Sequence, residues 1–298
     1  MNYNILLEKI SKAKFSLSPF KYLYIKDFIP KDEFISLTSD PQVILEEANN
    51  DMDLINLLHQ SDWEPIHFPG CTTNINDYIK WRNKESDFDN VNTCEGFGIT
   101  FRLKRSYSKL LEGYISFFRS EELKNCLCEK FNLNSEQTTY DTGFQKYLDG
   151  YEISPHPDVR KKALTFMLNV NPNPNSEEEF HHAHFCNFKP HMSYVQEYWK
   201  GNKHADRSWV PWDWCETKFL HNANNSITIF APDNDTMHGV KATYNHLKYQ
   251  RTQFYGNLWH KKEILQFKPN WQDFIINSSK EIRTSKKETK RINRQKLF

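Results

Sequence analysis

The second half of the chain is a succession of short extended runs separated by turn-forming residues. The runs span residues 143–148, 162–171, 226–230, 237–241 and 250–259. Each has the length of a strand, and the breaks between them contain Asn, Asp, Gly and Pro. Short strands of this kind predict a mainly β fold, a double-stranded β-helix (jelly roll) with a ligand cavity between two sheets.

The first 140 residues show a mixed pattern that predicts support for this core. We expect an N-terminal amphipathic helix and a cap for a later helix at Ser120, which Glu121 and Glu122 follow. The remaining expected elements are a strand at 22–26 and helices at 30–37, 43–49 and 105–131. The predicted class is therefore α+β, with a mixed α/β support region (1–140), a jelly-roll core (141–262) and a C-terminal extension (263–298).

A histidine and a carboxylate stand two residues apart just ahead of the run 162–171. They are His156 and Asp158, and in an extended segment side chains two apart point to the same face. His238 follows the run 226–230. Two imidazoles and one carboxylate on one side of a metal leave the opposite positions open. Such a site suits Fe(II) that must take up a co-substrate and dioxygen.

Two further positions extend this pattern: a Tyr-x-x-Gly turn ahead of the first histidine, and an arginine thirteen residues after the second. The complete order is Tyr147-x-x-Gly150, His156-x-Asp158, His238 and Arg251. This order, with extended runs between its members, resembles that of the Fe(II)/2-oxoglutarate-dependent dioxygenases, particularly their prolyl-hydroxylase-like branch. The resemblance covers roughly residues 141–260.

The resemblance implies a role for each position. His156, Asp158 and His238 would be the catalytic ligands of Fe(II), with 2-oxoglutarate and O2 as co-substrates. Arg251 would bind the far carboxylate of 2-oxoglutarate, because a guanidinium can grip a carboxylate with two parallel hydrogen bonds. Tyr147 would offer its hydroxyl to the same molecule.

Alternation along the last extended run agrees with a cavity at Arg251. One face carries Arg251, Gln253, Tyr255 and Asn257, and the other Thr252, Phe254, Gly256 and Leu258. The first set is polar, as a ligand cavity requires.

The implied activity is that of an oxidoreductase, a dioxygenase that hydroxylates a small-molecule or sugar-like substrate while 2-oxoglutarate yields succinate and CO2. Hydroxylation is expected because the chain keeps Asp158, whereas halogenating relatives have a small residue there. Protein or peptide prolyl hydroxylation is an alternative within the family. A zinc-dependent hydrolase with the same ligands would leave Arg251 without a role. A jelly-roll module that binds ligand without turnover is the third alternative.

Each residue taken singly also has a structural interpretation. His156 and Asp158 fit a surface hydrogen-bonded pair at a proline-bounded turn, and His238 fits a turn cap. Arg251 fits a cation on a strand edge, and Tyr147 fits a packed tyrosine with its hydroxyl at the rim. The joint occurrence of all five in the expected order favours the metal site.

A long segment, residues 171–225, interrupts the predicted strands. We expect this insert to fold as a lid over the cavity mouth, because loops of this length are usually functional or disordered and its four tryptophans argue against disorder. Trp209, Trp212 and Trp214 are candidates for stacking on a substrate, with packing as the alternative. The histidine cluster at 181–191 lacks the spacing of structural zinc sites and is interpreted as surface histidines.

Composition agrees with a cytoplasmic enzyme of 298 residues whose core is rich in aromatics, which make up 15% of the chain. Six cysteines without regular spacing predict no disulfide framework. No apolar run is long enough to cross a membrane. From residue 280 the tail has eight cations and two anions, so its net charge is +6. Because the whole chain has a net charge of +1, the rest of the chain carries −5. We interpret it as a solvated terminus; an anionic partner, including nucleic acid, remains the alternative. The oligomeric state is left open.

Overall fold

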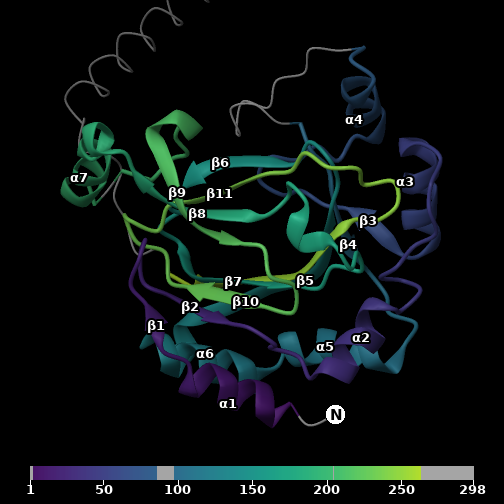
Figure 1. Cartoon of the computed structure of the whole chain (residues 1–298). Helices are drawn as coiled ribbons and strands as arrows, with labels where there is room; N and C mark the ends of the chain where they lie inside the picture. The colour runs from purple at the N-terminus through teal and green to yellow at the C-terminus, as the bar shows by residue number, and fades with distance from the viewer. Residues whose placement is uncertain (1–2, 86–96, 204, 263–298) are drawn as a thin grey trace, which may run out of the picture.

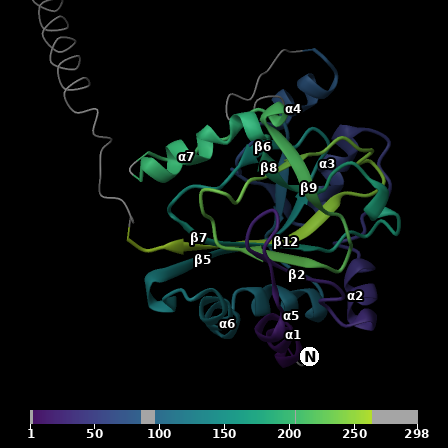
Figure 2. The ribbon, with the colours of Figure 1, turned by 60° about the vertical axis from the view of Figure 1, so that its left-hand side comes forward.

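The computed structural model describes residues 3–85, 97–203 and 205–262. Two antiparallel sheets face each other, and helices cover the outer side of the larger one (Figures 1 and 2). This arrangement confirms the prediction of a mainly β fold with flanking helices. The basic tail lies outside the described residues.

The larger sheet contains the strands that carry Arg251 and Tyr147. Its central strand, β12, pairs with β5 so that Arg251 stands opposite Tyr147. In spatial order the strands are β1 (Phe15–Ser16), β2 (Tyr22–Ile25), β10 (Ile227–Phe230), β7 (Lys162–Asn169), β12 (Arg251–His260), β5 (Thr138–Tyr147), β4 (Thr100–Leu103) and β3 (Trp63–Pro65).

The smaller sheet carries the two histidines of the motif. Strands β6 and β11 pair antiparallel, and their register sets His238 opposite His156. In spatial order the strands are β6 (Glu152–His156), β11 (His238–Lys241), β8 (Ala183–Phe188) and β9 (Cys215–His221). Five predicted strands are thus present. Four agree with their expected bounds within two residues, whereas β5 begins at Thr138, five residues before the predicted start.

Helices α1, α5 and α6 lie under the larger sheet (Figure 2). The predicted helix at 105–131 is two helices, because Ser108 and Ser120 each cap a new N-terminus. The cap at Ser120 is confirmed, since its hydroxyl accepts from the Leu123 N–H. The α-helices of the described residues are α1 (Asn4–Lys12), α2 (Lys31–Thr38), α3 (Asp51–Gln60), α4 (Ile75–Arg82), α5 (Lys109–Phe118), α6 (Glu121–Phe131) and α7 (Tyr194–Gly201).

The predicted helix at 43–49 is wrong. This segment consists of turns and loop, and its backbone groups form hydrogen bonds with other parts of the chain. The Val43 carbonyl accepts from the ammonium of buried Lys146 at 2.7 Å, and the Ala48 N–H donates to the carbonyl of Leu247. Tertiary hydrogen bonds therefore replace the ones that a helix would make.

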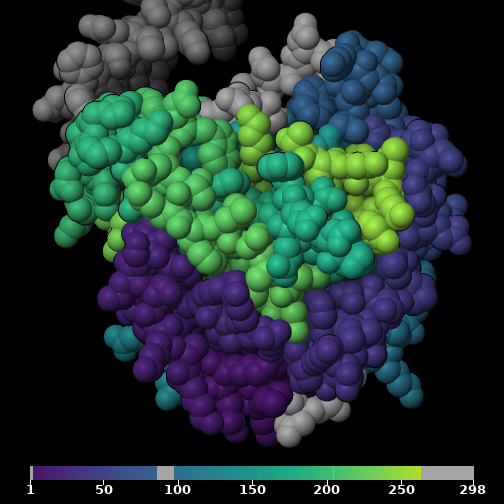
Figure 3. All heavy atoms as spheres, viewed as in Figure 1, coloured from purple at the N-terminus to yellow at the C-terminus, as the bar shows by residue number. Residues whose placement is uncertain are grey.

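The expectation that residues 171–225 are only an insert needs a correction. Two strands of the smaller sheet, β8 and β9, come from it, so the segment builds one wall of the barrel. The part between them contains α7, which projects beside the smaller sheet (Figure 1). In the space-filling view this green region covers the upper left of the molecule, above the purple N-terminal residues (Figure 3).

The main core lies between the larger sheet and the helices, and it is aromatic as predicted. Phe118 of α5 stacks on Phe254 with ring centroids 4.6 Å apart, and Phe254 packs on Phe144 at 4.4 Å. Phe254 and Leu258 face this core, whereas Arg251 and Gln253 face the space between the sheets. The predicted alternation along the last strand is thereby confirmed. Among the described residues no helix combines the length and apolar character needed to cross a membrane.

Gly256 marks a close approach within this core. A Cβ at this position would lie 2.2 Å from Cζ of Phe166, whose ring is stacked against Phe118. We expect Gly256→Ala to lower the free energy of unfolding by about 1–3 kcal/mol, because the ring must move in a packed core. Urea denaturation measures the change. Gly201→Ala is the control, since nothing lies within 4 Å of its Cβ position; equal stability of the two variants would contradict the packing.

Candidate metal centre

Three potential ligand side chains converge where β6 and β11 lie side by side. One donor atom each from His156, Asp158 and His238 lies within 4.8 Å of the others. Nε2 of His156 is 3.4 Å from Oδ1 of Asp158, and Nε2 of His238 is 3.7 Å from Oδ2. The structure thus brings together three residues that are up to 82 positions apart in the sequence. They are the only such group found among the described residues.

The hydrogen bonds of the two imidazoles identify their tautomers. Nδ1 of His156 lies 2.9 Å from the carbonyl of Ser154, and Nδ1 of His238 lies 2.9 Å from the carbonyl of Thr236. A carbonyl only accepts, so each Nδ1 carries a proton. In the neutral form of the rings each Nε2 then presents a lone pair toward the Asp158 carboxylate, and a metal cation between the three groups would satisfy them. Backbone carbonyls commonly orient metal-binding histidines in this way.

The titration of His238 also suits a ligand. Burial, together with the neighbouring His156, lowers the pKa of His238 to about 3. At neutral pH the ring is therefore uncharged and able to donate its lone pair. The donor set fits a borderline divalent ion such as Fe(II), which accepts two imidazoles and one carboxylate on one side.

Asp158 reaches the two histidines through a turn rather than through strand alternation. Strand β6 ends at His156, and Asp158 has φ 62°, in the left-handed region. The expectation that both residues share one face of an extended segment is therefore wrong, although they do meet. The turn is held by two side chains, since Thr236 donates to the carbonyl of Pro157 and Arg207 to that of Asp158, both at 3.1 Å. Aspartate tolerates this conformation better than most residues.

The carboxylate of Asp158 is fixed by two side chains of β7. Lys162 Nζ lies 2.7 Å from Oδ1, and the Thr165 hydroxyl donates to Oδ2 at 2.9 Å. Burial alone would raise the pKa of Asp158, but the neighbouring Lys162 ammonium holds it well below its usual range. Asp158 is thus ionised and oriented. Sequence reasoning missed Lys162; its position four residues after Asp158 was the available signal.

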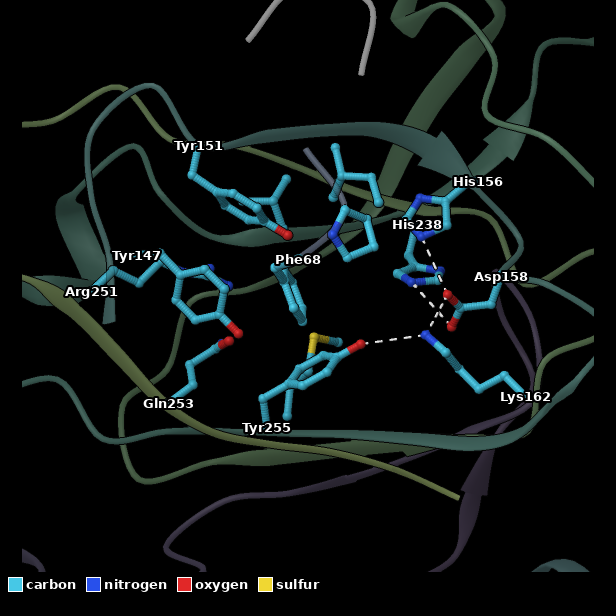
Figure 4. Close-up of a pocket in the computed structure, with 14 residues that line it drawn as sticks. Phe68, Tyr147, Tyr151, His156, Asp158, Lys162, His238, Arg251, Gln253 and Tyr255 are labelled. Atoms are coloured by element: carbon cyan, nitrogen blue, oxygen red, sulfur yellow. Dashed lines mark hydrogen bonds and ion pairs between the residues drawn. The ribbon is translucent and has the colours of Figure 1, made fainter. Parts of the chain in front are cut away.

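The same pocket extends away from the candidate ligands to Arg251. Figure 4 shows His156, His238 and Asp158 at one end, Arg251 and Tyr147 at the other. Arg251 is 2% exposed, and its Nη1 has no hydrogen-bond partner among the described residues. A buried guanidinium with a free donor is suited to an anionic ligand. Arg251 is therefore not a surface cation.

Tyr147 supports Arg251 with its ring. The guanidinium carbon lies 4.4 Å from the ring centroid, a cation–π distance. The hydroxyl bonds the side chain of Gln145, and burial raises the pKa of Tyr147, so the hydroxyl stays protonated. Its predicted contact with a co-substrate stays a prediction.

Aromatic residues line the middle of the pocket. Phe68, from the loop after β3, lies between the two ends (Figure 4), with its ring 5.1 Å from that of Tyr255 and 5.9 Å from that of Tyr147. The hydroxyl oxygen of Tyr255 lies 3.3 Å from Nζ of Lys162, which donates a hydrogen bond to it. Sequence reasoning did not single out Phe68, because nothing in its neighbourhood marks a site.

The three candidate tryptophans do not line this pocket. Trp212 donates from Nε1 to Glu152 at 2.7 Å, and its ring lies against Gly239, on the face of β11 opposite to His238. Trp214 packs with Trp199 and Val210 in a small cluster of its own. A contact between substrate and Trp209, Trp212 or Trp214 therefore stays a prediction.

The interpretation of His181 and His182 as surface residues is wrong. They are 2% and 3% exposed, and their rings lie 4.5 Å apart ahead of β8. The ring of His181 packs on Tyr244, whose hydroxyl accepts from the N–H of Arg251. His191, by contrast, is exposed. The first two histidines thus belong to the buried surroundings of Arg251.

No family model matches the sequence, and no curated protein matches it. Several solved structures resemble it at low identity. One is a prolyl-4-hydroxylase from Pseudomonas putida (TM-score 0.42, 9% identity, 86% of this chain and 100% of the other). Another is a prolyl hydroxylase from Trichoplax adhaerens in complex with a peptide of hypoxia inducible factor (TM-score 0.38, 13% identity, 86% of this chain and 87% of the other). A third is the epimerase SnoN with Fe3+, alpha ketoglutarate and nogalamycin RO (TM-score 0.40, 8% identity, 86% of this chain and 82% of the other).

Proposed function

We propose that this protein is an Fe(II)- and 2-oxoglutarate-dependent dioxygenase that hydroxylates a small-molecule substrate. One observation carries the proposal: a single pocket joins three residues that could bind a metal to a buried arginine, one of whose nitrogens has no hydrogen-bond partner in the described part of the chain. A metal site alone fits many reactions. The additional buried cation fits a co-substrate that binds the metal through one end and carries a carboxylate at the other.

Each residue of the pocket then has a distinct task. His156, Asp158 and His238 would hold the ferrous ion, which activates O2 so that a C–H bond becomes C–OH while 2-oxoglutarate is oxidised to succinate and CO2. Arg251 binds the far carboxylate, and the Tyr147 ring keeps the guanidinium in place. Lys162 and Thr165 keep the Asp158 carboxylate ionised and oriented. Phe68 and Tyr255 keep the space between the ends apolar and exclude water.

The alternatives make different predictions for the same protein. A zinc hydrolase would need the three ligands but not Arg251. A binding module without turnover would consume no oxygen. Prolyl hydroxylation of a peptide would require a groove open to an extended chain. Proline-containing peptides would then accelerate the turnover of 2-oxoglutarate.

The direct test is turnover of the co-substrate. Iron-loaded protein is incubated with 2-oxoglutarate labelled at C1 and with fractionated cell metabolites. The release of labelled CO2 is followed, together with the amount of unlabelled succinate. We expect one fraction to accelerate both in equal amounts, with equimolar O2 uptake. Absence of release with every fraction and with iron retained would contradict the proposal.

We expect Arg251→Ala to raise the KM for 2-oxoglutarate by about 100-fold, because a buried charge-assisted pair contributes roughly 3 kcal/mol. Iron retention should stay unchanged, since Arg251 lies at the other end of the pocket. Arg251→Lys should recover part of the loss. The control is Arg119→Ala at the exposed end of α5. An unchanged KM for 2-oxoglutarate in Arg251→Ala would contradict the assignment of Arg251 to the far carboxylate.

A further inference from the structure

One side chain at the metal end of the pocket has more hydrogen-bond donors than the described residues accept. Lys162 begins β7 and is 8% exposed, and its ammonium points into the pocket between Asp158 and Tyr255 (Figure 4). Nζ lies 2.7 Å from Oδ1 of Asp158 and 3.3 Å from the hydroxyl oxygen of Tyr255. These are its two hydrogen-bond acceptors in the described part of the chain. An ammonium has three hydrogens, so one is left for a ligand.

The ammonium of Lys162 is held in this position by its surroundings. Nζ lies 5.5 Å from the ring centroid of Trp259, which pairs with Lys162 across the larger sheet. A buried charge is costly unless its neighbours satisfy it. Orientation of Asp158 alone does not require a charge, because the neutral hydroxyl of Thr165 already holds Oδ2. The buried ammonium therefore suits a further partner.

The pocket contains little negative charge of its own. Among the described residues that line it, Asp158 is the one acid. Two other acids are close to lining residues in the sequence, but both have partners outside the pocket. Asp149 forms an ion pair with Arg82, and Glu152 accepts a hydrogen bond from Trp212. The ammonium is therefore balanced by the same carboxylate that a metal ion would use.

Counting formal charges in the loaded pocket leaves one positive charge at this end. A ferrous ion and Lys162 together supply three positive charges. Asp158 and the near carboxylate of 2-oxoglutarate supply two negative charges, and histidine ligands are uncharged. At the other end the far carboxylate balances Arg251. A single excess charge in a buried site matches a monoanion, whereas a phosphate dianion would leave a negative excess.

We propose that Lys162 is a specificity-determining residue that binds a carboxylate group of the substrate. The proposal rests on the proposed function and deepens it, because it names carboxylic acids as the substrate class. The third hydrogen of the ammonium donates to the substrate carboxylate, and another stays with Asp158. A substrate bound in this way lies beside the three candidate metal ligands, with the rings of Phe68 and Tyr255 next to it.

Fluoroacetate and fluoroacetamide are the probes for the first experiment, since they are small and differ in charge. Their binding to the full-length protein, loaded with redox-inactive Zn(II) and 2-oxoglutarate, is measured by fluorine NMR line broadening. We expect the wild-type protein to bind fluoroacetate about tenfold or more tightly than fluoroacetamide, because the anion forms a charge-assisted hydrogen bond. An absence of this preference would overturn the proposal, whatever the variants do.

Two variants assign the preference to Lys162. Lys162→Gln removes the charge and keeps an N–H donor for Asp158, so fluoroacetate binding should weaken about tenfold or more while fluoroacetamide binding and zinc content stay unchanged. Lys162→Arg should recover part of the loss. Lys161→Gln is the matched control, because the neighbouring lysine is exposed. Equal fluoroacetate binding in Lys162→Gln and Lys161→Gln would mean that the anion binds elsewhere, which overturns the proposal.

The second experiment tests the substrate class with the wild-type protein alone. Cell metabolites are separated on an anion exchanger at neutral pH, and each fraction is added to iron-loaded protein with 2-oxoglutarate. We expect a retained fraction to accelerate succinate release, and methyl esterification of that fraction to abolish the acceleration. Acceleration by the uncharged flow-through, or by an esterified fraction, would overturn the substrate class and leave the proposed function standing. Failure of every fraction would contradict the proposed function, while the fluorine measurement would still decide on Lys162.

Discussion

Replacing His156, Asp158 or His238 by alanine is expected to abolish iron retention or 2-oxoglutarate turnover. Each change removes one of three donors whose atoms lie within 4.8 Å of one another. The loss should exceed the roughly 10- to 100-fold that follows when only a supporting partner of a ligand is removed. Iron content after gel filtration and succinate release by the same samples measure the effect.

Two graded controls make this result specific. Thr165→Val removes the hydrogen bond to Oδ2 of Asp158 and keeps the ligand, so it should fall between wild type and Asp158→Ala. The exposed His191→Ala should retain iron and turnover. Normal turnover in the Asp158→Ala protein would contradict the ligand assignment.

Lowering the pH from 7 to 5 is expected to destabilise the metal-free protein by several kcal/mol. His181, His182 and His221 are buried, and burial, helped by nearby positive charge, lowers their pKa values to about 2, 4 and 3. The unfolded chain binds protons on these residues below its ordinary pKa of about 6.5, whereas the folded chain does not. Stability is therefore complete above that pH and is lost as the pH falls toward the folded values. At pH 5 each group costs up to roughly 2 kcal/mol.

Urea denaturation at pH 7 and pH 5 tests the expected pH dependence. His221→Gln should flatten it by one group's share, because the ring that bonds Ser226 and Thr228 no longer titrates. His191→Gln, at an exposed position, should leave the slope as it is. Equal stability of the wild-type protein at both pH values would show that the buried histidines are not held neutral. His238, whose pKa is also lowered to about 3, adds its own share in the metal-free protein, whereas none of the other three histidines is a candidate ligand.

The sequence pattern predicted much of the site because the pattern itself is regular. Alternation along β12 places Arg251 and Gln253 in the pocket and Phe254 in the core, as a period of two requires. The predicted run 237–241 marked the strand that carries His238, whereas β6, which ends at His156, was not among the predicted strands. The order of His156, Asp158 and His238 predicted three side chains that the structure does bring together.

The rest depended on backbone geometry that spacing does not reveal. Asp158 meets the histidines through a left-handed residue, which a His-x-Asp spacing cannot distinguish from a strand. Lys162 acts on Asp158 across that turn, and its role follows from the fold of the turn. Strand β9 is exposed along most of its length and lacks a clear alternation of buried residues. This strand was therefore not recognised in the sequence. The burial of His181 was not recognised either, because it depends on packing against Tyr244, which is distant in the sequence.

The central claim is that one pocket holds ferrous iron at His156, Asp158 and His238 and the far carboxylate of 2-oxoglutarate at Arg251. The most direct measurement is anomalous X-ray diffraction from crystals soaked without oxygen in Fe(II) and 2-oxoglutarate. We expect an iron peak within bonding distance of both Nε2 atoms and an Asp158 oxygen, with continuous density for the keto acid ending at the Arg251 guanidinium. Iron bound elsewhere, or a keto acid that does not reach Arg251, would contradict the account.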